Sequence, residues 1–588
     1  MRYHALAADY DGTLAHRGVI DDATWVALKR FRESGRKLVM VTGRQLDELL
    51  AILGPSAEGF DRIVAENGAL IYEPATKEVR ILAEPPPEEF VQELERRGVD
   101  RVSCGRVIVA TWEPHEDTVF HVIHEQGLGL QVIFNKGAVM VLPSGVNKAT
   151  GLVEALRELG LSPHNVVAIG DAENDHSLLA SCECGVAVAN ALPVLKDKAD
   201  VLTRRPHGAG VCELIEHVLR DDLAAAASRL QRHHALLGHT ADGMRVGIDP
   251  YAANIMVCGT SGSGKSTLTT GLLERLASAG YQFAIIDPEG DFTAMDPAVV
   301  LGGPQRAPLV EEVLDVLDSP GDNVVVNMLG VALEHRPEFF VKLLPAMADL
   351  RSRTGRPHWV IVDEAHHLLP AAWGDGEGLS LRPHGTIYIT VHPGSVAAPI
   401  LETIDTVIAV GGQPDETMRE FCHAANIGTP KPCKEDKLPT GTALYWRVGD
   451  KHAHVVRTEA PKSERMRHSR KYTEGNLGQD RSFYFKGRDG KLNLKAHNLQ
   501  LFLHIGDGVD DETWLYHLQL GDYSKWLRTE VKDEALADEV AAVEQDAAIT
   551  APTGRAAIRS AVEKRYTLPA DKPSGVVDAP IAVLAAAK

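Results

Sequence analysis

The chain lacks the features that would place it in a membrane or outside the cell. Its 588 residues contain no apolar run of the about eighteen residues or more that a membrane-spanning helix needs. The first residues, MRYHALAADYDGTL, lack the basic, apolar and small-residue sections of a secretory signal peptide. The sequence therefore predicts a cytoplasmic protein that has no membrane partner.

Cysteine is scarce, and its spacing excludes a common class of metal site. The seven cysteines are scattered, and the closest two, Cys182 and Cys184, have no second pair nearby. Tetrahedral zinc sites need such paired spacing. We therefore interpret the cysteines as reduced thiols, most of them in the core.

An excess of positive charge is also missing. The 61 Lys and Arg residues face 81 Asp and Glu residues, so the formal net charge is −20. Such a charge keeps a protein soluble and opposes nonspecific attraction to phosphate backbones. A local basic channel is still compatible with it, but a dedicated nucleic-acid binder is disfavoured.

The chain has the composition and length of a folded multidomain protein. Hydrophobic residues make up 44% and charged residues 24% of it, which are ordinary globular values. Because 588 residues are too many for one hydrophobic core, length alone predicts about three to five domains.

The first chemistry-bearing segment follows an apolar strand expected at residues 4–8. Asp9 and Asp11 stand at the carboxyl end of this strand, where open α/β sheets place their ligands, and Gly12 and Thr13 follow. One carboxylate can attack phosphorus while the other protonates the leaving oxygen, and Mg²⁺ can neutralise the repulsion between carboxylate and phosphate. A surface loop of acids and turn residues is the alternative for this segment taken alone.

Three later segments weigh against that alternative. The buried-type strand at residues 38–41 ends at Thr42, whose hydroxyl can bind a phosphate oxygen. Lys148 follows a loop and supplies a positive charge. The strand at residues 166–169 ends in residues 170–175, GDAEND, whose carboxylates can bind a metal. Four such segments in this order predict a site for phosphoryl chemistry.

The four segments resemble the motifs of the haloacid dehalogenase (HAD) superfamily in its Cof-like subclass, HAD-IIB. The resemblance covers about residues 1–222 and implies a Rossmann-like α/β core with an α/β cap inserted between the second and third motifs. Residues 66–69 resemble the turn that precedes this cap, which we expect at about residues 73–145. A short cap is typical of the phosphoglycolate and sugar-phosphate phosphatases of the subclass, so the resemblance implies a small phosphorylated metabolite as substrate.

The resemblance also implies a role for each matching residue. Asp9 would be the nucleophile that forms an aspartyl-phosphate, and Asp11 would be the general acid and base. Thr42 and Lys148 would hold the phosphoryl group. Mg²⁺ would be held by the following groups: Asp9, the Asp11 carbonyl and Asp171, with Asn174 and Asp175 supporting them.

A second set of motifs is typical of a nucleotide-binding domain. An apolar strand expected at residues 254–258 runs into the loop GTSGSGKST and then into a helix expected at 268–277, which is the context that makes a P-loop specific. Loop N–H groups and the helix N-terminus would cradle the phosphates of ATP. A Gly/Ser linker is the alternative, which the flanking strand and helix disfavour. The ATP-binding residues expected here are Gly259, Gly262, Gly264, Lys265, which would reach the β/γ oxygens, Ser266, which would bind Mg²⁺, and Thr267.

The strand expected at residues 359–362 ends in a Walker B pattern. Asp363 would hold the metal through water, and the adjacent Glu364 would polarise the attacking water. Because a small-molecule kinase needs no such base, Glu364 predicts ATP hydrolysis.

The order of these motifs resembles the HerA/FtsK group of RecA-like ATPases, which assemble into hexameric rings and often move DNA. The resemblance covers about residues 240–455, within an ATPase domain that we expect at residues 223–458. Asp287 and Glu289 lie between the motifs, where they would approach the γ-phosphate or form a strand-end turn, and both interpretations stay open. His392 stands where many relatives carry Gln.

Ring ATPases commonly complete their site with an arginine from the neighbouring subunit. Arg351, Arg353 and Arg356 are candidates, although a solvated helix end explains each of them equally well. The resemblance thus leads us to expect a homo-oligomer, with a hexameric ring as one form.

The remaining residues carry no motif with assigned chemistry. Residues 459–566 show helical spacing of apolar side chains and predict a small, mostly helical domain. Within it, residues 514–527 resemble a helical domain of unknown function that accompanies some HAD hydrolases, and we expect their aromatic side chains in its core. The basic stretch 462–471 is interpreted as a linker rather than a nucleic-acid contact, and residues 567–588 as a flexible tail.

The leading hypothesis is an Mg²⁺-dependent phosphatase for a small metabolite, joined to an ATPase that regulates or assembles it. The alternative is a nucleic-acid translocase or defence ATPase whose HAD domain removes phosphate from nucleic-acid ends. A third hypothesis makes the ATPase domain a scaffold with negligible turnover, which Glu364 disfavours. Nucleic acid is an expected partner only under the alternative.

Overall fold

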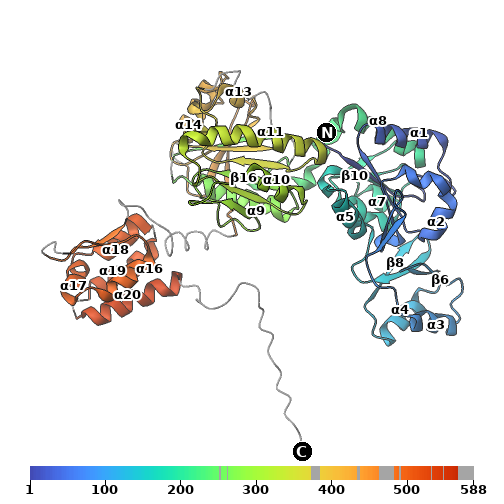
Figure 1. The fold of residues 1–588 in the computed structure, drawn as a ribbon, viewed down its shortest axis with the longest axis horizontal. Coiled ribbons are helices and arrows are strands. Elements are labelled where there is room, and N and C mark those ends of the chain that lie inside the picture. Colours follow the sequence, from blue (N-terminus) through green and yellow to red (C-terminus); the bar gives the residue numbers. More distant parts are fainter. Residues whose placement is uncertain are drawn as a thin grey trace, which may run out of the picture. The chain divides into compact units, whose positions relative to one another are not determined.

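The computed structural model describes residues 1–250, 253–260, 262–372, 384–432, 438–462, 482–488, 492–531, 533–546 and 548–566 (Figure 1). They fall in two compact units, Met1–Pro461 and Lys462–Lys588. The predicted tail at 567–588 and all but the first residue of the basic stretch 462–471 lie outside the described residues.

The first sheet of unit one has eight strands in the order β12-β11-β10-β1-β2-β3-β4-β5 (blue to teal in Figure 1). The pairs from β12 to β3 are parallel, and β4 and β5 add an antiparallel edge. Every residue of β1 and β10 is buried, as expected for parallel strands that helices cover on both faces. The strands are β1 (Ala5–Ala8), β2 (Lys37–Val41), β3 (Arg62–Ala65), β4 (Leu70–Glu73), β5 (Glu78–Ile81), β10 (Val166–Gly170), β11 (Cys184–Ala187) and β12 (Val201–Leu202); the helices are α1 (Asp22–Glu33), α2 (Leu46–Leu53), α5 (Lys148–Glu158), α6 (His176–Ser181), α7 (Pro193–Lys196) and α8 (His207–Asp221).

An inserted cap has its own sheet and its own core. Four antiparallel strands run in the order β6-β7-β9-β8, and the helices pack on them around Phe90, Val119 and Val139. Strand β7 begins at Val109, because the N–H groups of the three residues before it donate to the Glu66 carboxylate. The elements are α3 (Glu88–Arg96), β6 (Ser103–Cys104), β7 (Val109–Trp112), α4 (Glu116–Glu125), β8 (Leu130–Asn135) and β9 (Ala138–Pro143).

The second sheet has eleven strands in the order β14-β13-β23-β22-β21-β15-β20-β19-β16-β18-β17 (green to gold in Figure 1). Alternate residues of β15 enter different cores, Met256 and Cys258 on one face and Ile255 and Val257 on the other. Since strand side chains alternate, helices cover both faces of this sheet as well. The strands are β13 (Ala235–Thr240), β14 (Arg245–Ile248), β15 (Asn254–Cys258), β16 (Phe283–Asp287), β17 (Val299–Gly302), β18 (Val324–Asn327), β19 (Trp359–Val362), β20 (Thr386–Thr390), β21 (Thr406–Val410), β22 (Thr442–Arg447) and β23 (His454–Thr458); the helices are α9 (Lys265–Ser278), α10 (Val310–Asp318), α11 (Arg336–Thr354), α12 (Ala365–Leu368), α13 (Ala398–Leu401) and α14 (Pro414–Ala424).

Unit two is a small, mostly helical body with an aromatic core. Phe483, Phe502, Trp514 and Tyr523 are buried against one another, so these aromatic side chains pack inside, as expected. Its elements are β24 (Phe483–Phe485), β25 (Leu494–Ala496), α16 (Leu499–Gly508), α17 (Asp511–Gln519), α18 (Asp522–Trp526), α19 (Glu534–Glu544) and α20 (Ala551–Tyr566).

The expected fold class is confirmed: a Rossmann-like α/β core with a cap, a second α/β domain with a P-loop, and a mostly helical C-terminal part. The cysteines of the described residues are free thiols, and Cys182, Cys184, Cys258 and Cys422 are buried. Among the described helices, none has the length and apolar character that crossing a membrane requires.

Candidate active sites

Three carboxylates predicted to bind or support Mg²⁺ lie together at one edge of the first sheet. Asp9 follows β1 and Asp171 follows β10, and these strands pair in parallel with Ala8 opposite Ile169. Because parallel neighbours end at the same edge, the two carboxylates meet there. One oxygen each of Asp9, Asp171 and Asp175 lies within 4.8 Å of the others.

Lys148 holds two of these carboxylates together. Its ammonium donates to Oδ1 of Asp9 and to Oδ1 of Asp175, each at 2.6 Å, and all three side chains are buried. Lys148 is the first residue of α5, which the side chain of Asn147 caps. Burial and the neighbouring Asp175 raise the pKa of Asp9 to about 8, although Lys148 opposes this shift. A cation beside Asp9 therefore stabilises the ionised form that nucleophilic attack requires.

Asp175 shapes the loop that follows β10. Its Oδ2 accepts the backbone N–H groups of Asp171 at 2.9 Å and Ala172 at 3.0 Å. A Cβ at Gly170 would lie 2.6 Å from Cβ of Asp175, so this close approach requires glycine. Since both oxygens of Asp175 accept hydrogen bonds from the protein, its side chain fits the supporting role in the metal site.

Asp171 has the properties of a metal ligand. Its Oδ1 is buried, and no hydrogen-bond donor among the described residues reaches it. A buried carboxylate oxygen without a donor is costly, and burial raises the pKa of Asp171. Mg²⁺ prefers carboxylate and carbonyl oxygens. The ion therefore fits the predicted set of Asp9, Asp171 and the carbonyl of Asp11.

Asp11, the predicted general acid and base, is held by Arg44. Nε and Nη2 of Arg44 donate to the two Asp11 oxygens at 2.6 and 2.8 Å, which is a bidentate pair. The backbone N–H of Arg44 donates to Oγ1 of Thr42 at 3.1 Å. Thr42 follows β2 and is buried. The sequence assigned a role to the Thr42 hydroxyl but none to the Arg44 side chain.

The sequence motifs did not identify Asn190 as a residue of the site. Its amide donates to the carbonyl oxygen of Gly12 at 2.8 Å and to Oδ2 of Asp171 at 3.3 Å. Nδ1 of His207 lies 2.8 Å from the same Gly12 carbonyl. Asn190 comes shortly after β11, the neighbour of β10. Its place beyond the carboxyl end of a buried strand is the one signal that could have found it.

Glu66 fixes the segment that enters the cap sheet. Its buried carboxylate accepts the backbone N–H groups of Arg106, Val107 and Ile108 at 3.0, 2.7 and 2.9 Å. A Cβ at Gly105 would lie 2.6 Å from Oε1 of Glu66. Glu66 also has φ 52°, a left-handed conformation that non-glycine residues rarely adopt. The sequence marked this turn as preceding the cap but not as its anchor.

In the second sheet, the glycine-rich loop connects β15 to α9. Gly259, Gly262 and Gly264 have φ values of 150°, 74° and 98°, which favour glycine. A Cβ on Gly259 would also lie 2.2 Å from the carbonyl oxygen of Val410. The loop therefore needs its glycines for conformation and for close approach.

Lys265 begins α9, as the P-loop pattern predicts. Its ammonium donates to the carbonyl oxygens of Gly259 and Thr260 at 3.0 and 3.2 Å, and burial lowers its pKa. Ser266 and Thr267 follow in the first turn and are half-buried. The backbone N–H groups of this turn and its positive helix dipole fit the phosphates of ATP.

Asp363 and Glu364 follow β19, which lies two strands from β15 across β20. Burial and the neighbouring Asp287 raise the pKa of Asp363 well above its usual range. Glu364 has φ 44° and ψ 50°, a strained conformation of the kind that gathers at functional sites. Nδ1 of His366 lies 3.4 Å from its Oε2, and the ring of His392 lies 5.5 Å from that of His366. The two Walker B carboxylates thus stand at the same sheet edge as the P-loop.

Asp287 supports the turn that follows β16. Its Oδ1 accepts the N–H groups of Gly290 and Asp291 at 2.8 and 3.0 Å, and its Oδ2 accepts that of Phe292 at 2.8 Å. Of the two interpretations left open for Asp287, the strand-end turn is the one its contacts favour.

The three arginines considered for a neighbouring subunit's site have partners of their own. Arg356 is buried and donates to the carbonyl oxygen of Gly160 at 2.6 Å. Arg351 donates to backbone carbonyl oxygens, and Arg353 pairs with Asp349 at 3.1 Å. Burial rules out Arg356 as a residue that reaches another subunit.

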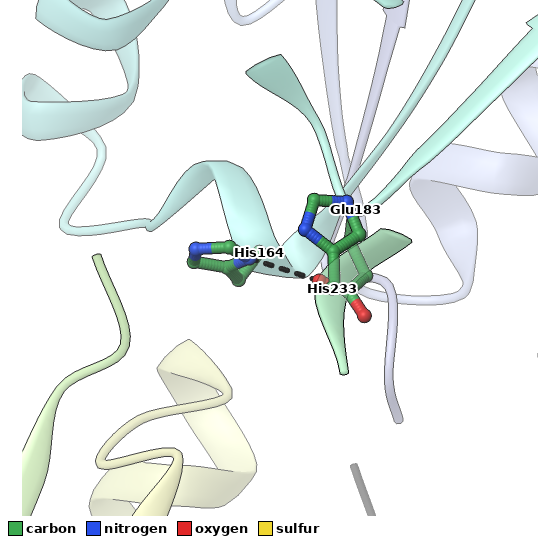
Figure 2. A group of neighbouring side chains, drawn as sticks. All are labelled: His164, Glu183 and His233. Carbon is green, nitrogen blue, oxygen red and sulfur yellow. Dashed lines mark hydrogen bonds and ion pairs between the residues drawn. The ribbon is translucent and has the colours of Figure 1, made fainter. Parts of the chain in front are cut away.

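A buried polar junction joins the two α/β parts of unit one at the amino ends of their strands. His164 lies before β10, and Glu183 lies before β11; Figure 2 shows the hydrogen bond between them, which measures 2.9 Å. Nε2 of His164 lies 2.6 Å from the carbonyl oxygen of Ala279, directly after α9. Tyr281, before β16, stacks on His164 with ring centroids 3.7 Å apart and donates to Glu183 at 2.8 Å.

The same cluster has side chains that can bind metals. Donor atoms of His164, Glu183 and His233 lie within 4.8 Å of one another (Figure 2). However, the guanidinium of Arg2 already lies 2.7 Å from Oε1 of Glu183, and Oε2 accepts from His164 and Tyr281. Burial raises the pKa of Glu183, but the hydrogen bond from His164 and the nearby positive charges outweigh it and hold this pKa well below its usual range. The guanidinium of Arg2 thus already supplies the positive charge that a metal ion would bring to Glu183. We therefore interpret the cluster as an ion-pair junction.

Two family models match separate parts of the chain. A model described as haloacid dehalogenase-like hydrolase matches residues 6–100 and 116–215, which include every predicted residue of the first site. A model described as AAA domain matches residues 249–381, which include the P-loop, Asp363 and Glu364.

Relatives of known function resemble the first part. Phosphoglycolate phosphatase 2 of Saccharolobus solfataricus is 31% identical over 223 residues, which are 36% of this chain and 91% of that protein. The phosphoglycolate phosphatase of Methanothermobacter thermautotrophicus is 31% identical over 226 residues, which are 37% of this chain and 98% of that protein. A solved haloacid dehalogenase-like hydrolase from Bacteroides thetaiotaomicron is 24% identical with a TM-score of 0.32, and the alignment covers 37% of this chain and 99% of that one. The chain therefore belongs to the haloacid dehalogenase-like hydrolases, and it is an enzyme that joins a HAD phosphatase domain to an ATPase domain of the AAA type.

Proposed function

We propose that the first domain hydrolyses the phosphomonoester of a small metabolite through an aspartyl-phosphate on Asp9, with Mg²⁺ as cofactor. The observation that carries this proposal is the buried Lys148 ammonium, 2.6 Å from both Asp9 and Asp175, in a carboxylate cluster that also holds the unsatisfied Oδ1 of Asp171. This arrangement offers a nucleophile, a fixed cation for the phosphoryl oxygens and a carboxylate for a divalent ion.

The reaction has two halves. A carboxylate oxygen of Asp9 attacks phosphorus, the bond from phosphorus to the leaving oxygen breaks, and Asp11 gives that oxygen its proton. Water then attacks the aspartyl-phosphate, Asp11 takes up the proton of the water, and phosphate leaves Asp9. Lys148 and Thr42 hold the phosphoryl oxygens, and Arg44 orients Asp11. Bound Mg²⁺ neutralises negative charge on the phosphoryl group.

The relatives support one substrate class in particular. The two phosphatases compared above act on phosphoglycolate, which supports this compound, with a sugar phosphate as the next candidate. Phosphate release with Mg²⁺ from 2-phosphoglycolate, a set of sugar phosphates and a 3′-phosphorylated oligonucleotide tests the proposal. Release from a small molecule supports it. Release from the oligonucleotide alone would favour instead the nucleic-acid processing enzyme considered from the sequence.

We propose further that the second domain binds and hydrolyses ATP, with Lys265 and Ser266 at the phosphates and Mg²⁺, and Glu364 at the attacking water. The motif order supports a place in the HerA/FtsK group and assembly of several copies into a ring. Size-exclusion chromatography with light scattering, with and without ATP, tests the assembly: a hexamer supports it, and a monomer under both conditions contradicts it.

The ATPase domain regulates the phosphatase in this proposal, and the junction supports the coupling. His164 contacts Ala279 directly after the P-loop helix α9, and it lies just before β10, the strand that carries Asp171. A shift of α9 on ATP binding would therefore act on an element that ends in the phosphatase site. Buried hydrogen-bonded contacts transmit such shifts because they have few alternative arrangements.

The coupling is tested by phosphatase kinetics with and without ATP, in wild type and in Lys265→Ala. ATP is expected to change kcat/KM of the wild type but not of the variant. If ATP has no effect on the wild type and Lys265→Ala keeps the same oligomeric state, the coupling is wrong.

A further inference from the structure

Lys136 brings a positive charge from the cap to the phosphatase site. It lies with Gly137 in the two-residue turn between β8 and β9, and both residues have positive φ values, 50° and 86°. Such tight turns set the hairpin geometry and therefore the position of its tip. The tip is placed over the core by the cap, which Glu66 anchors at the segment before β7.

The ammonium of Lys136 contacts the groups that form the reaction end of the site. It donates to Oδ2 of Asp171 at 2.8 Å and lies 3.5 Å from the carbonyl oxygen of Asp11. A Cβ at Gly12 would lie 2.9 Å from this ammonium, so the cap tip and the nucleophile loop approach closely. The contact does not bury the side chain, which remains 46% exposed and accessible to a ligand.

Lys148 and Lys136 contact different groups of the site. Lys148 is buried between Asp9 and Asp175. Lys136 comes from the cap and remains exposed, so the organic part of a substrate can reach it. A divalent ion held by Asp171 would repel the ammonium of Lys136. The favourable partner left for Lys136 is then a negative group on the organic part of the substrate.

We propose that Lys136 selects a substrate whose organic part carries a carboxylate close to the phosphoester, by pairing with that carboxylate. The inference rests on the proposed phosphatase function and narrows its substrate class to phosphorylated short-chain hydroxy acids. Phosphate esters of uncharged polyols, such as simple sugar phosphates, lack the carboxylate that Lys136 binds.

Two probes that differ in one group test this assignment. 2-Phosphoglycolate carries the carboxylate, and 2-hydroxyethyl phosphate, which is smaller by one oxygen atom, carries an uncharged hydroxymethyl group in its place. The ratio of kcat/KM between the two is expected to favour 2-phosphoglycolate in wild type and to fall about ten- to hundredfold in Lys136→Ala, because a hydrogen bond between charged groups is lost. Lys136→Arg is expected to keep most of the preference.

A matched control separates this effect from a general loss of charge. Lys77 lies exposed in the turn between β4 and β5, so Lys77→Ala removes the same charge from another turn. In Lys77→Ala, the ratio of kcat/KM between the two probes is expected to equal that of wild type. Equal ratios in wild type and Lys136→Ala would overturn the proposal.

Binding without turnover gives an independent readout. In the Asp9→Asn background, calorimetric titration with 2-phosphoglycolate is expected to show about tenfold or more weaker binding when Lys136→Ala is added, with a much smaller change for 2-hydroxyethyl phosphate. Equal losses for both probes would overturn the assignment. If wild type cleaves only phosphomonoesters without a carboxylate, the assignment of Lys136 is wrong and the phosphatase function is retained. If Asp9→Asn keeps full turnover, the proposed function itself is wrong.

Discussion

Nε2 of His164 lies 2.6 Å from the carbonyl oxygen of Ala279, so a side chain of the phosphatase domain binds the end of the P-loop helix. Nδ1 of the same ring lies 2.9 Å from Glu183. The imidazole thus links Glu183 of the phosphatase domain to Ala279 of the ATPase domain, and one substitution removes both contacts.

His164→Ala is therefore expected to uncouple the two domains. ATP should change the phosphatase kcat/KM in wild type, and the ratio with and without ATP should move towards one in the variant, because the contact with α9 is lost. His124→Ala, which removes an exposed histidine of the cap, is the control and should behave as wild type. An unchanged ATP effect in His164→Ala would show that the junction does not carry the signal.

Lys148→Met should disable the phosphatase. Loss of a fixed cation at the phosphoryl group is expected to lower kcat about a hundred- to thousandfold, and Lys148→Arg should retain part of the rate. Steady-state phosphate release measures the loss, and ATP hydrolysis by the same preparation reports whether the chain is still folded. A variant that keeps more than a tenth of the wild-type rate with 2-phosphoglycolate would contradict the role of Lys148.

Glu364→Gln should separate ATP binding from ATP hydrolysis. Removing the base is expected to slow hydrolysis about a hundredfold or more, while titration with a fluorescent ATP analogue should still show binding. Lys265→Ala, by contrast, should weaken binding itself. Negligible ATP turnover by the wild type would instead support a nucleotide-dependent scaffold.

The junction should depend on pH through Glu183. Its pKa in the folded protein is held below the ordinary value of 4.5, so its contribution to stability is fully present above pH 4.5 and is lost as pH falls towards the folded pKa. Glu183→Gln lacks this contribution. The variant should therefore unfold at a lower temperature than wild type at pH 6, and the difference should shrink below pH 4.5.

Thermal unfolding at pH 6 and at pH 3.5 checks this expectation. At pH 6 the loss of a buried ionic partner is expected to cost about 3 kcal/mol or more. A difference between the two proteins that is equal at both pH values would contradict an ionised Glu183 at the junction.

The residues at strand ends could be found from the sequence, because apolar strands and the polar side chains that follow them are local patterns. Asp9, Thr42 and Asp171 follow β1, β2 and β10, as expected, and Lys265 begins α9. The P-loop glycines were found in the same way.

The residues that come from other parts of the fold could not be found in this way. Lys136 reaches the site from a cap hairpin, and Asn190 reaches it from a loop after β11. Arg356 reads as a helix-end cation in the sequence, whereas in the structure it binds the carbonyl oxygen of Gly160 inside the junction. Such contacts join residues distant in sequence, and no local spacing marks them.

In the proposed mechanism, Asp9 is the nucleophile of a phosphatase. The most direct test of this role is Mg²⁺-dependent phosphate release from 2-phosphoglycolate by wild type and by Asp9→Asn, with ATP hydrolysis by both proteins as the control for folding. We expect release by wild type, a loss of about a thousandfold or more in the variant because the covalent step is removed, and equal ATP hydrolysis by both proteins. Release at similar rates by both proteins would contradict this role of Asp9.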